Sequence, residues 1–110
     1  RATEALQRAG LWSALRGKLV LGENAAQAAQ FATSGNAQGG IIAYSLALSP
    51  ALAKQSRFAL IPPDWHQPLR QRMVLLNNAS EAGAAFYAFL QQPDARKILR
   101  TYGFSLPDED

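Results

Sequence analysis

The turn Gly22-Glu23-Asn24-Ala25 is the strongest candidate for chemistry in this sequence. The short apolar run 18–21 before it predicts a buried strand, and an alanine-rich helix is expected after it. Asn24 and Gln27 match a capping box, in which the Asn side chain accepts a hydrogen bond from an N–H of the first helical turn. The Ala25 N–H then stays free to donate to an oxyanion at the helix start. The alternative left open by spacing alone is a well-capped turn that binds nothing.

Tyr44 and Ser45 are the second candidates, because they end the next predicted strand. The carboxyl ends of parallel strands meet at one sheet edge, which is the usual ligand position in open α/β sheets. Both hydroxyls could therefore donate to the same oxyanion. The alternatives are a tyrosine packed inside the lobe and a serine that caps the following turn.

The remaining polar residues predict neither catalysis nor a metal centre. The chain has no cysteine and a single histidine, His66, which excludes thiolate zinc sites and multi-histidine sites within it. Asp64 is close to His66 in sequence, but no serine nucleophile stands nearby in a sharp-turn motif. Nothing fixes the separation of Glu23 from Asp64 as an acid–base pair. We therefore expect no catalytic residue, no enzyme activity and no cofactor.

Composition predicts a globular domain without nucleic-acid partners. Hydrophobic residues make up 48% of the chain, and the net charge of +3 comes from basic residues spread along its length. Lys54, Arg57, Arg70 and Arg72 flank predicted strands and are expected in solvent; the alternative is that they face an acidic partner. The longest apolar stretch, 39–48, is far shorter than the roughly 20 residues that span a bilayer.

The order of predicted elements places the chain in the α/β class. A strand, a helix and a second strand in succession imply a parallel pair with a right-handed crossover. Glycines 10, 35 and 103 are expected at helix ends, Ser13 and Ser80 as helix caps, and the polar tail from Pro107 is expected to fray. The predicted strands are 18–21, 40–44, 58–61 and 72–76, and the predicted helices are 3–9, 25–33, 81–90 and 93–102.

Several segments, taken in order, resemble the periplasmic molybdate-binding proteins. The resemblance covers nearly the whole chain, and its specificity comes from the ordered set of segments. They include Gly10-Leu11-Trp12-Ser13-Ala14-Leu15, Lys18-Leu19-Val20-Leu21-Gly22-Glu23-Asn24, Gln27-Ala28-Ala29-Gln30-Phe31, Ser34-Gly35-Asn36-Ala37, Ser45-Leu46-Ala47-Leu48-Ser49, Phe58-Ala59-Leu60-Ile61-Pro62, Pro68-Leu69-Arg70-Gln71, Gln92-Pro93-Asp94-Ala95-Arg96 and Tyr102-Gly103-Phe104.

The resemblance implies a two-lobe type II periplasmic-binding-protein fold, with a short, mostly parallel sheet flanked by helices. Residues 1–110 would be its C-terminal portion, one lobe plus the segment returning to the other lobe, with the N-terminal lobe absent. The position after Glu23-Asn24 is the family's main-chain N–H ligand, which maps to Ala25. A family tyrosine ligand aligns with Ala43, so that Tyr44 is displaced by one position.

The function implied by the resemblance is periplasmic binding of molybdate, and of tungstate, for an ABC permease and its ATPase. The ligand would be held without a cofactor or a coordinating metal. A receptor for sulfate or phosphate and the effector-binding domain of a transcriptional regulator stay open as alternatives. Strands that lack partners from the other lobe would leave sheet edges open, so a homo-oligomer of this chain is expected.

Overall fold

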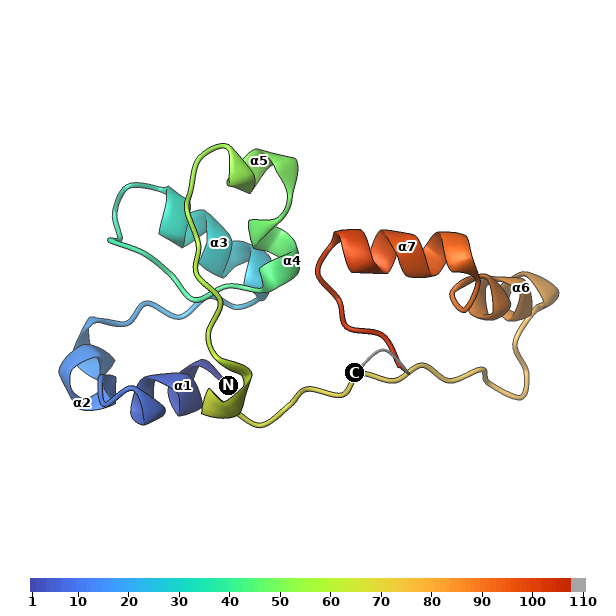
Figure 1. Cartoon of the computed structure of the whole chain (residues 1–110), viewed down its shortest axis with the longest axis horizontal. Helices are drawn as coiled ribbons and strands as arrows, with labels where there is room; N and C mark the ends of the chain where they lie inside the picture. The colour runs from blue at the N-terminus through green and yellow to red at the C-terminus, as the bar shows by residue number, and fades with distance from the viewer. Residues whose placement is uncertain (108–110) are drawn as a thin grey trace. The chain divides into compact units, whose positions relative to one another are not determined.

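The computed structural model describes residues 1–107 and divides the chain into two units, of which the second begins at Arg70. The first unit contains α1 (Ala2–Arg8), α2 (Trp12–Leu15), the 3₁₀ turn η1 (Arg16–Lys18), α3 (Ala25–Thr33), α4 (Tyr44–Ala47), α5 (Pro50–Ala53) and the 3₁₀ turn η2 (Pro63–Trp65). The second unit contains α6 (Glu81–Phe89) and α7 (Pro93–Thr101) (Figure 1). The tail expected to fray lies, beyond Pro107, outside the described residues.

The predicted sheet is absent from residues 1–107, so the expected short, mostly parallel sheet is not confirmed. The four segments predicted as strands run without helical structure, except that Lys18 ends η1 and Tyr44 begins α4. Leu19 and Ala43 have extended backbone angles, with ψ of 137° and 138°. A strand forms only where its N–H and C=O groups pair with a neighbouring strand, and no such ladder exists among these residues.

Two helices end as their glycines predict. Beyond α1, Gly10 has φ of 74°, its N–H donates to the carbonyl of Gln7, and the Leu11 N–H donates to the carbonyl of Leu6. Beyond α7, Gly103 has φ of 82°, and the N–H groups of residues 103 and 104 donate to the carbonyls of residues 100 and 99. Both pairs of bonds define Schellman motifs, which need a residue in the left-handed conformation.

The serine caps were predicted correctly at one helix and wrongly at another. Ser80 Oγ accepts a hydrogen bond from the Gly83 N–H at 3.1 Å and so caps α6. Ser13 lies inside α2, whose N-cap is Leu11 without a side-chain bond. The short spacing from Gly10 to Trp12 leaves no room for a serine cap, because the chain turns into α2 immediately after the Schellman motif.

The buried apolar side chains of the first unit are all small. Its fully buried apolar side chains are Ala5, Ala29 and Ala47, each less than 5% exposed. The Gln67 N–H donates to the Glu4 carboxylate at 2.9 Å, which ties the end of this unit to α1. Gly40 packs so closely on α3 that an added Cβ would lie 2.7 Å from the Cβ of Ala32.

Gly40→Ala should destabilise the first unit, whereas Gly39→Ala should not. The new methyl group at position 40 must push residue 40 away from α3, since an added Cβ there meets Ala32 at 2.7 Å, while position 39 has no atom within 4 Å. We expect a loss of about 1–3 kcal/mol for Gly40→Ala and about 0.5 kcal/mol or less for Gly39→Ala. Urea unfolding followed by far-UV circular dichroism measures both. Equal stability of the two variants would contradict this packing.

Candidate functional site

The start of α3 is built as the sequence predicts. Asn24 is the N-cap, with extended backbone angles of −152° and 173°, and its side-chain oxygen accepts from the Gln27 N–H at 2.9 Å. The predicted capping box is therefore confirmed on the asparagine side. This bond satisfies one of the four backbone donors that an α-helix leaves free at its first turn.

The glutamine side of the box differs from the usual arrangement. Gln27 Oε1 accepts from the N–H of Glu23 at 2.6 Å, one residue before the N-cap, instead of from the Asn24 N–H. Among the described residues, the N–H groups of Asn24, Ala25 and Ala26 then have no hydrogen-bond acceptor. The Ala25 amide singled out by the sequence is thus one of three consecutive donors without a protein partner.

The close approach of Gly22 to α3 positions this turn. An added Cβ on Gly22 would lie 2.7 Å from the Ala28 nitrogen and 3.0 Å from the Asn24 carbonyl oxygen, so only glycine fits there. The chain therefore passes directly beside the first helical turn, while Asn24, Ala25 and Ala26 stay exposed. Exposed amides at a positive helix end can take the oxygens of an anion without any charged side chain.

Tyr44 lies in a different setting from the one predicted. It is the first residue of α4, not the end of a strand, and Ser45 lies within the same short helix. The Tyr44 ring contacts the Phe58 ring, with centroids 5.6 Å apart and planes inclined by 56°. The structure therefore does not bring these hydroxyls to a sheet edge shared with Ala25, because the described residues form no sheet. The aromatic contact with Phe58 was missed, since nothing in local spacing relates positions 44 and 58.

The residues weighed for catalysis remain isolated. His66 Nδ1 lies 2.9 Å from the backbone carbonyl oxygen of Gln67, and Asp64 is part of η2. Over residues 1–107 no group of three or more His, Asp or Glu side chains is placed to hold a metal ion. The same residues contain no helix that is long and apolar enough to cross a membrane.

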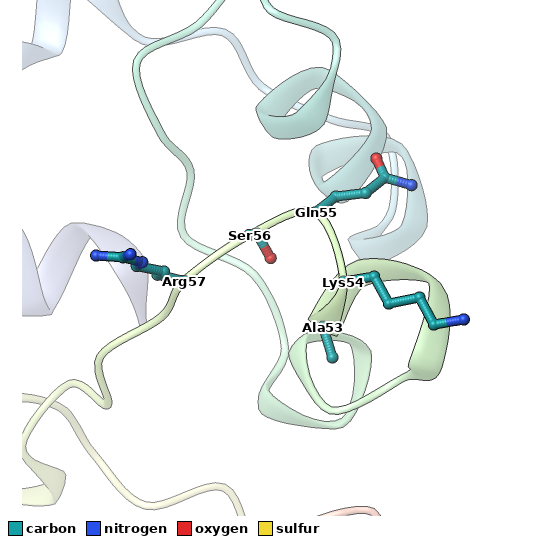
Figure 2. A pocket seen from close by; sticks show the side chains of 5 residues that line it. All are labelled: Ala53, Lys54, Gln55, Ser56 and Arg57. Carbon is teal, nitrogen blue, oxygen red and sulfur yellow. The ribbon is translucent and has the colours of Figure 1, made fainter.

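A basic loop follows α5 and lines a shallow cavity of about 400 Å³ that sequence reasoning did not single out (Figure 2). Five consecutive residues, 53–57, form its wall. The side chains of Lys54 and Arg57 extend in opposite directions, and the Ser56 hydroxyl donates to the Leu52 carbonyl at 2.7 Å. The two cations do not converge on one point, and both are exposed, as expected for solvated side chains.

The N-terminus of a helix with unpaired N–H groups is a common site for binding an oxyanion. Comparison with known proteins shows which family of proteins this chain belongs to. Residues 1–105 match the family described as bacterial extracellular solute-binding protein, and the chain belongs to this family. No solved structure matches the chain significantly.

Three of the individual relatives share one description. The chain is similar to the molybdate-binding proteins ModA of Rhodobacter capsulatus (37% identity over 106 residues), Azotobacter vinelandii (33% over 107) and Escherichia coli K12 (31% over 106). These alignments cover 94–96% of this chain but only 40–42% of each relative. The chain thus spans about two fifths of the length of the relatives that it matches.

Asn24→Ala should destabilise α3 by about 1 kcal/mol, because the Gln27 N–H loses its acceptor. Asn24→Ser is the matched control, since a serine oxygen can cap the same N–H and should keep most of the stability. Urea unfolding of both variants gives the difference. An alanine variant as stable as the serine variant would show that the cap bond contributes nothing.

Proposed function

We propose that this chain is the C-terminal portion of a periplasmic receptor that binds molybdate, and tungstate, for an ABC importer. The observation that supports it most directly is the set of three free amides at the start of α3, in a chain 31–37% identical to molybdate-binding proteins. The receptor would deliver its ligand to a membrane permease driven by an ATPase. It is a binding protein without catalytic residues, cofactor or coordinating metal.

The chemistry of the proposed site is recognition of a dianion by neutral donors. Ala25 is the assigned main-chain ligand, and Asn24 and Ala26 offer adjacent N–H groups without protein acceptors. A helix N-terminus stabilises negative charge through its aligned peptide dipoles, so a cationic side chain is not required. A donor set without lysine or arginine also suits an ion that must be released again to a permease.

Two other functions fit part of these observations. A receptor for sulfate or phosphate would use the same free amides, and only the size of the binding site would distinguish it. The effector-binding domain of a transcriptional regulator shares the two-lobe architecture and would need a DNA-binding segment elsewhere in the protein. The transport receptor is favoured, because the family match is to extracellular solute-binding proteins.

The 110-residue chain alone should bind molybdate only weakly. Removing a dianion from water costs more free energy than the donors of one helix start return, because the donors of a second lobe are required to complete the site. Isothermal titration calorimetry of the chain with molybdate tests this. Submicromolar binding by a chain that light scattering shows to be monomeric would contradict the expectation.

Ala25→Pro should weaken molybdate binding at least about tenfold in a complete two-lobe protein, since a hydrogen bond to a charged group contributes roughly 1.5–3 kcal/mol. The protein to use is a hybrid in which this chain replaces the matching region of the Rhodobacter capsulatus relative. Proline replaces the amide hydrogen with a ring carbon and leaves the helix start intact, because the first helical position tolerates proline and Asn24 already has the extended conformation that must precede it.

The matched control is Ala25→Gly, which keeps the N–H and should keep the affinity. Glu81→Pro makes the same change at the first position of α6 and should also leave binding unchanged. Tyr44→Phe removes only the hydroxyl and keeps the ring contact with Phe58; a marked loss of affinity would assign Tyr44 to the site. A hybrid that prefers sulfate, or binds no molybdate, would overturn the proposed function.

A further inference from the structure

The side chain of Gln27 connects α3 to the chain that leads into it. Its Oε1 accepts a hydrogen bond from the Glu23 N–H at 2.6 Å, and the Gln27 backbone N–H donates to Asn24 Oδ1 at 2.9 Å. Glu23 and Asn24 are exposed, whereas Gln27 is partly buried. A single residue of the first helical turn therefore bonds both to the N-cap and to the residue before it.

The donor chosen by the Gln27 side chain decides which N–H groups stay unpaired. In the usual capping box this side chain would accept from the N–H of the N-cap, which here is Asn24. Because Gln27 accepts from Glu23 instead, the Asn24 N–H has no acceptor among the described residues. The unpaired N–H groups are then those of residues 24–26, while the N–H groups on either side, at residues 23 and 27, are both satisfied. Gln27 thus sets both limits of the donor set.

The side chain that makes this bond is neutral. Glutamate and glutamine both occur at this position of a capping box, and a glutamate also interacts favourably with the positive end of the helix. The first turn of α3 contains no acidic residue, whereas Glu81 and Asp94 lie in the first turns of α6 and α7. Glu23 precedes the N-cap and is exposed. With a neutral acceptor at position 27, no carboxylate of its own first turn compensates the positive end of α3.

We propose that Gln27 is a positioning residue of the molybdate site, an inference that rests on the proposed function. Its side-chain carbonyl orders the chain before Asn24, so that the ligand meets the N–H groups of residues 24–26 in a turn that is already formed. A preformed turn binds more tightly, because less conformational freedom is lost on binding. The neutrality of the glutamine leaves the favourable interaction with the positive helix end to the dianion.

The first test uses amide hydrogen exchange of the 110-residue chain, followed by NMR, without any ligand. Relative to the rates of an unstructured peptide, the Glu23 N–H should exchange more slowly than the N–H groups of residues 24–26, which have no acceptor among the described residues. Gln27→Met keeps the length and helix propensity of the side chain but removes the carbonyl, and should speed exchange at Glu23 about three- to tenfold. A Glu23 N–H without protection in the unmodified chain would overturn the proposal.

The second test measures molybdate affinity by isothermal titration calorimetry in the two-lobe hybrid with the Rhodobacter capsulatus relative. Gln27→Met should weaken binding about three- to tenfold, because the turn loses its order. Gln27→Glu should keep the hydrogen bond and the stability of α3 but weaken binding about tenfold or more, because a carboxylate then stands beside the dianion. Raising the salt concentration to about 0.5 M should diminish only the loss caused by Gln27→Glu, since salt screens charge.

Gln30→Met and Gln30→Glu are the matched controls, because Gln30 is exposed and lies in α3 about one turn further along. Both variants should bind molybdate within about twofold of the unmodified hybrid. Unchanged affinity in Gln27→Met, or an equal loss in the Gln30 variants, would overturn the positioning role while molybdate binding by the unmodified hybrid still supports the proposed function.

Urea unfolding of the hybrid variants separates positioning from a purely structural role. A loss of affinity in Gln27→Glu that only follows a loss of stability would show a structural role and overturn the proposal. Gln27→Glu with unchanged stability and weaker, salt-dependent binding supports it. A hybrid that binds no molybdate before any substitution at position 27 would overturn the proposed function, and the role of Gln27 with it.

Discussion

The hydrogen bonds at the start of α3 hold the turn in place and leave three consecutive backbone N–H groups without an acceptor among the described residues. A helix leaves its first backbone N–H groups without internal partners, and each must find an acceptor in the protein, in water or in a ligand. Here Asn24 satisfies the Gln27 amide, and the Gln27 side chain turns to Glu23. These two hydrogen bonds fix the conformation of the turn, while the N–H groups of residues 24–26 keep no acceptor among the described residues.

The same donors explain why one helix start is not a complete receptor. A dianion in water is surrounded by hydrogen bonds, and a protein site must replace nearly all of them to bind it tightly. The amides of Asn24, Ala25 and Ala26 approach an ion from one side only. The chain spans about 40% of the length of its relatives, and the proposed site would need donors from elsewhere to surround the ion. In such a site, preorganisation of this turn by Gly22 and Gln27 lowers the cost of ordering on binding.

Local features could be predicted from the sequence, whereas the sheet and the place of Tyr44 could not. The Asn24 cap, the Ser80 cap and the left-handed Gly10 each depend on atoms within about four residues, so residue types at fixed spacing suffice to predict them. A strand depends on partners that are distant in sequence, and the resemblance implied partners that these residues do not contain. Tyr44 was assigned to a sheet edge by the same reasoning, and without a sheet its position is determined by α4 and Phe58.

The segments predicted as strands have no strand partner in residues 1–107, and several of their apolar side chains are exposed. Val20 and Leu21 were predicted in a buried strand, and Val74 and Leu76 in another strand. Each of these four side chains is at least 64% exposed. Exposing apolar area of this size in water is unfavourable by about 25 cal/mol per Å², so these segments are driven toward any strand that can cover them. After Val20 the chain leads directly into the turn at Asn24, where three backbone N–H groups have no acceptor among the described residues.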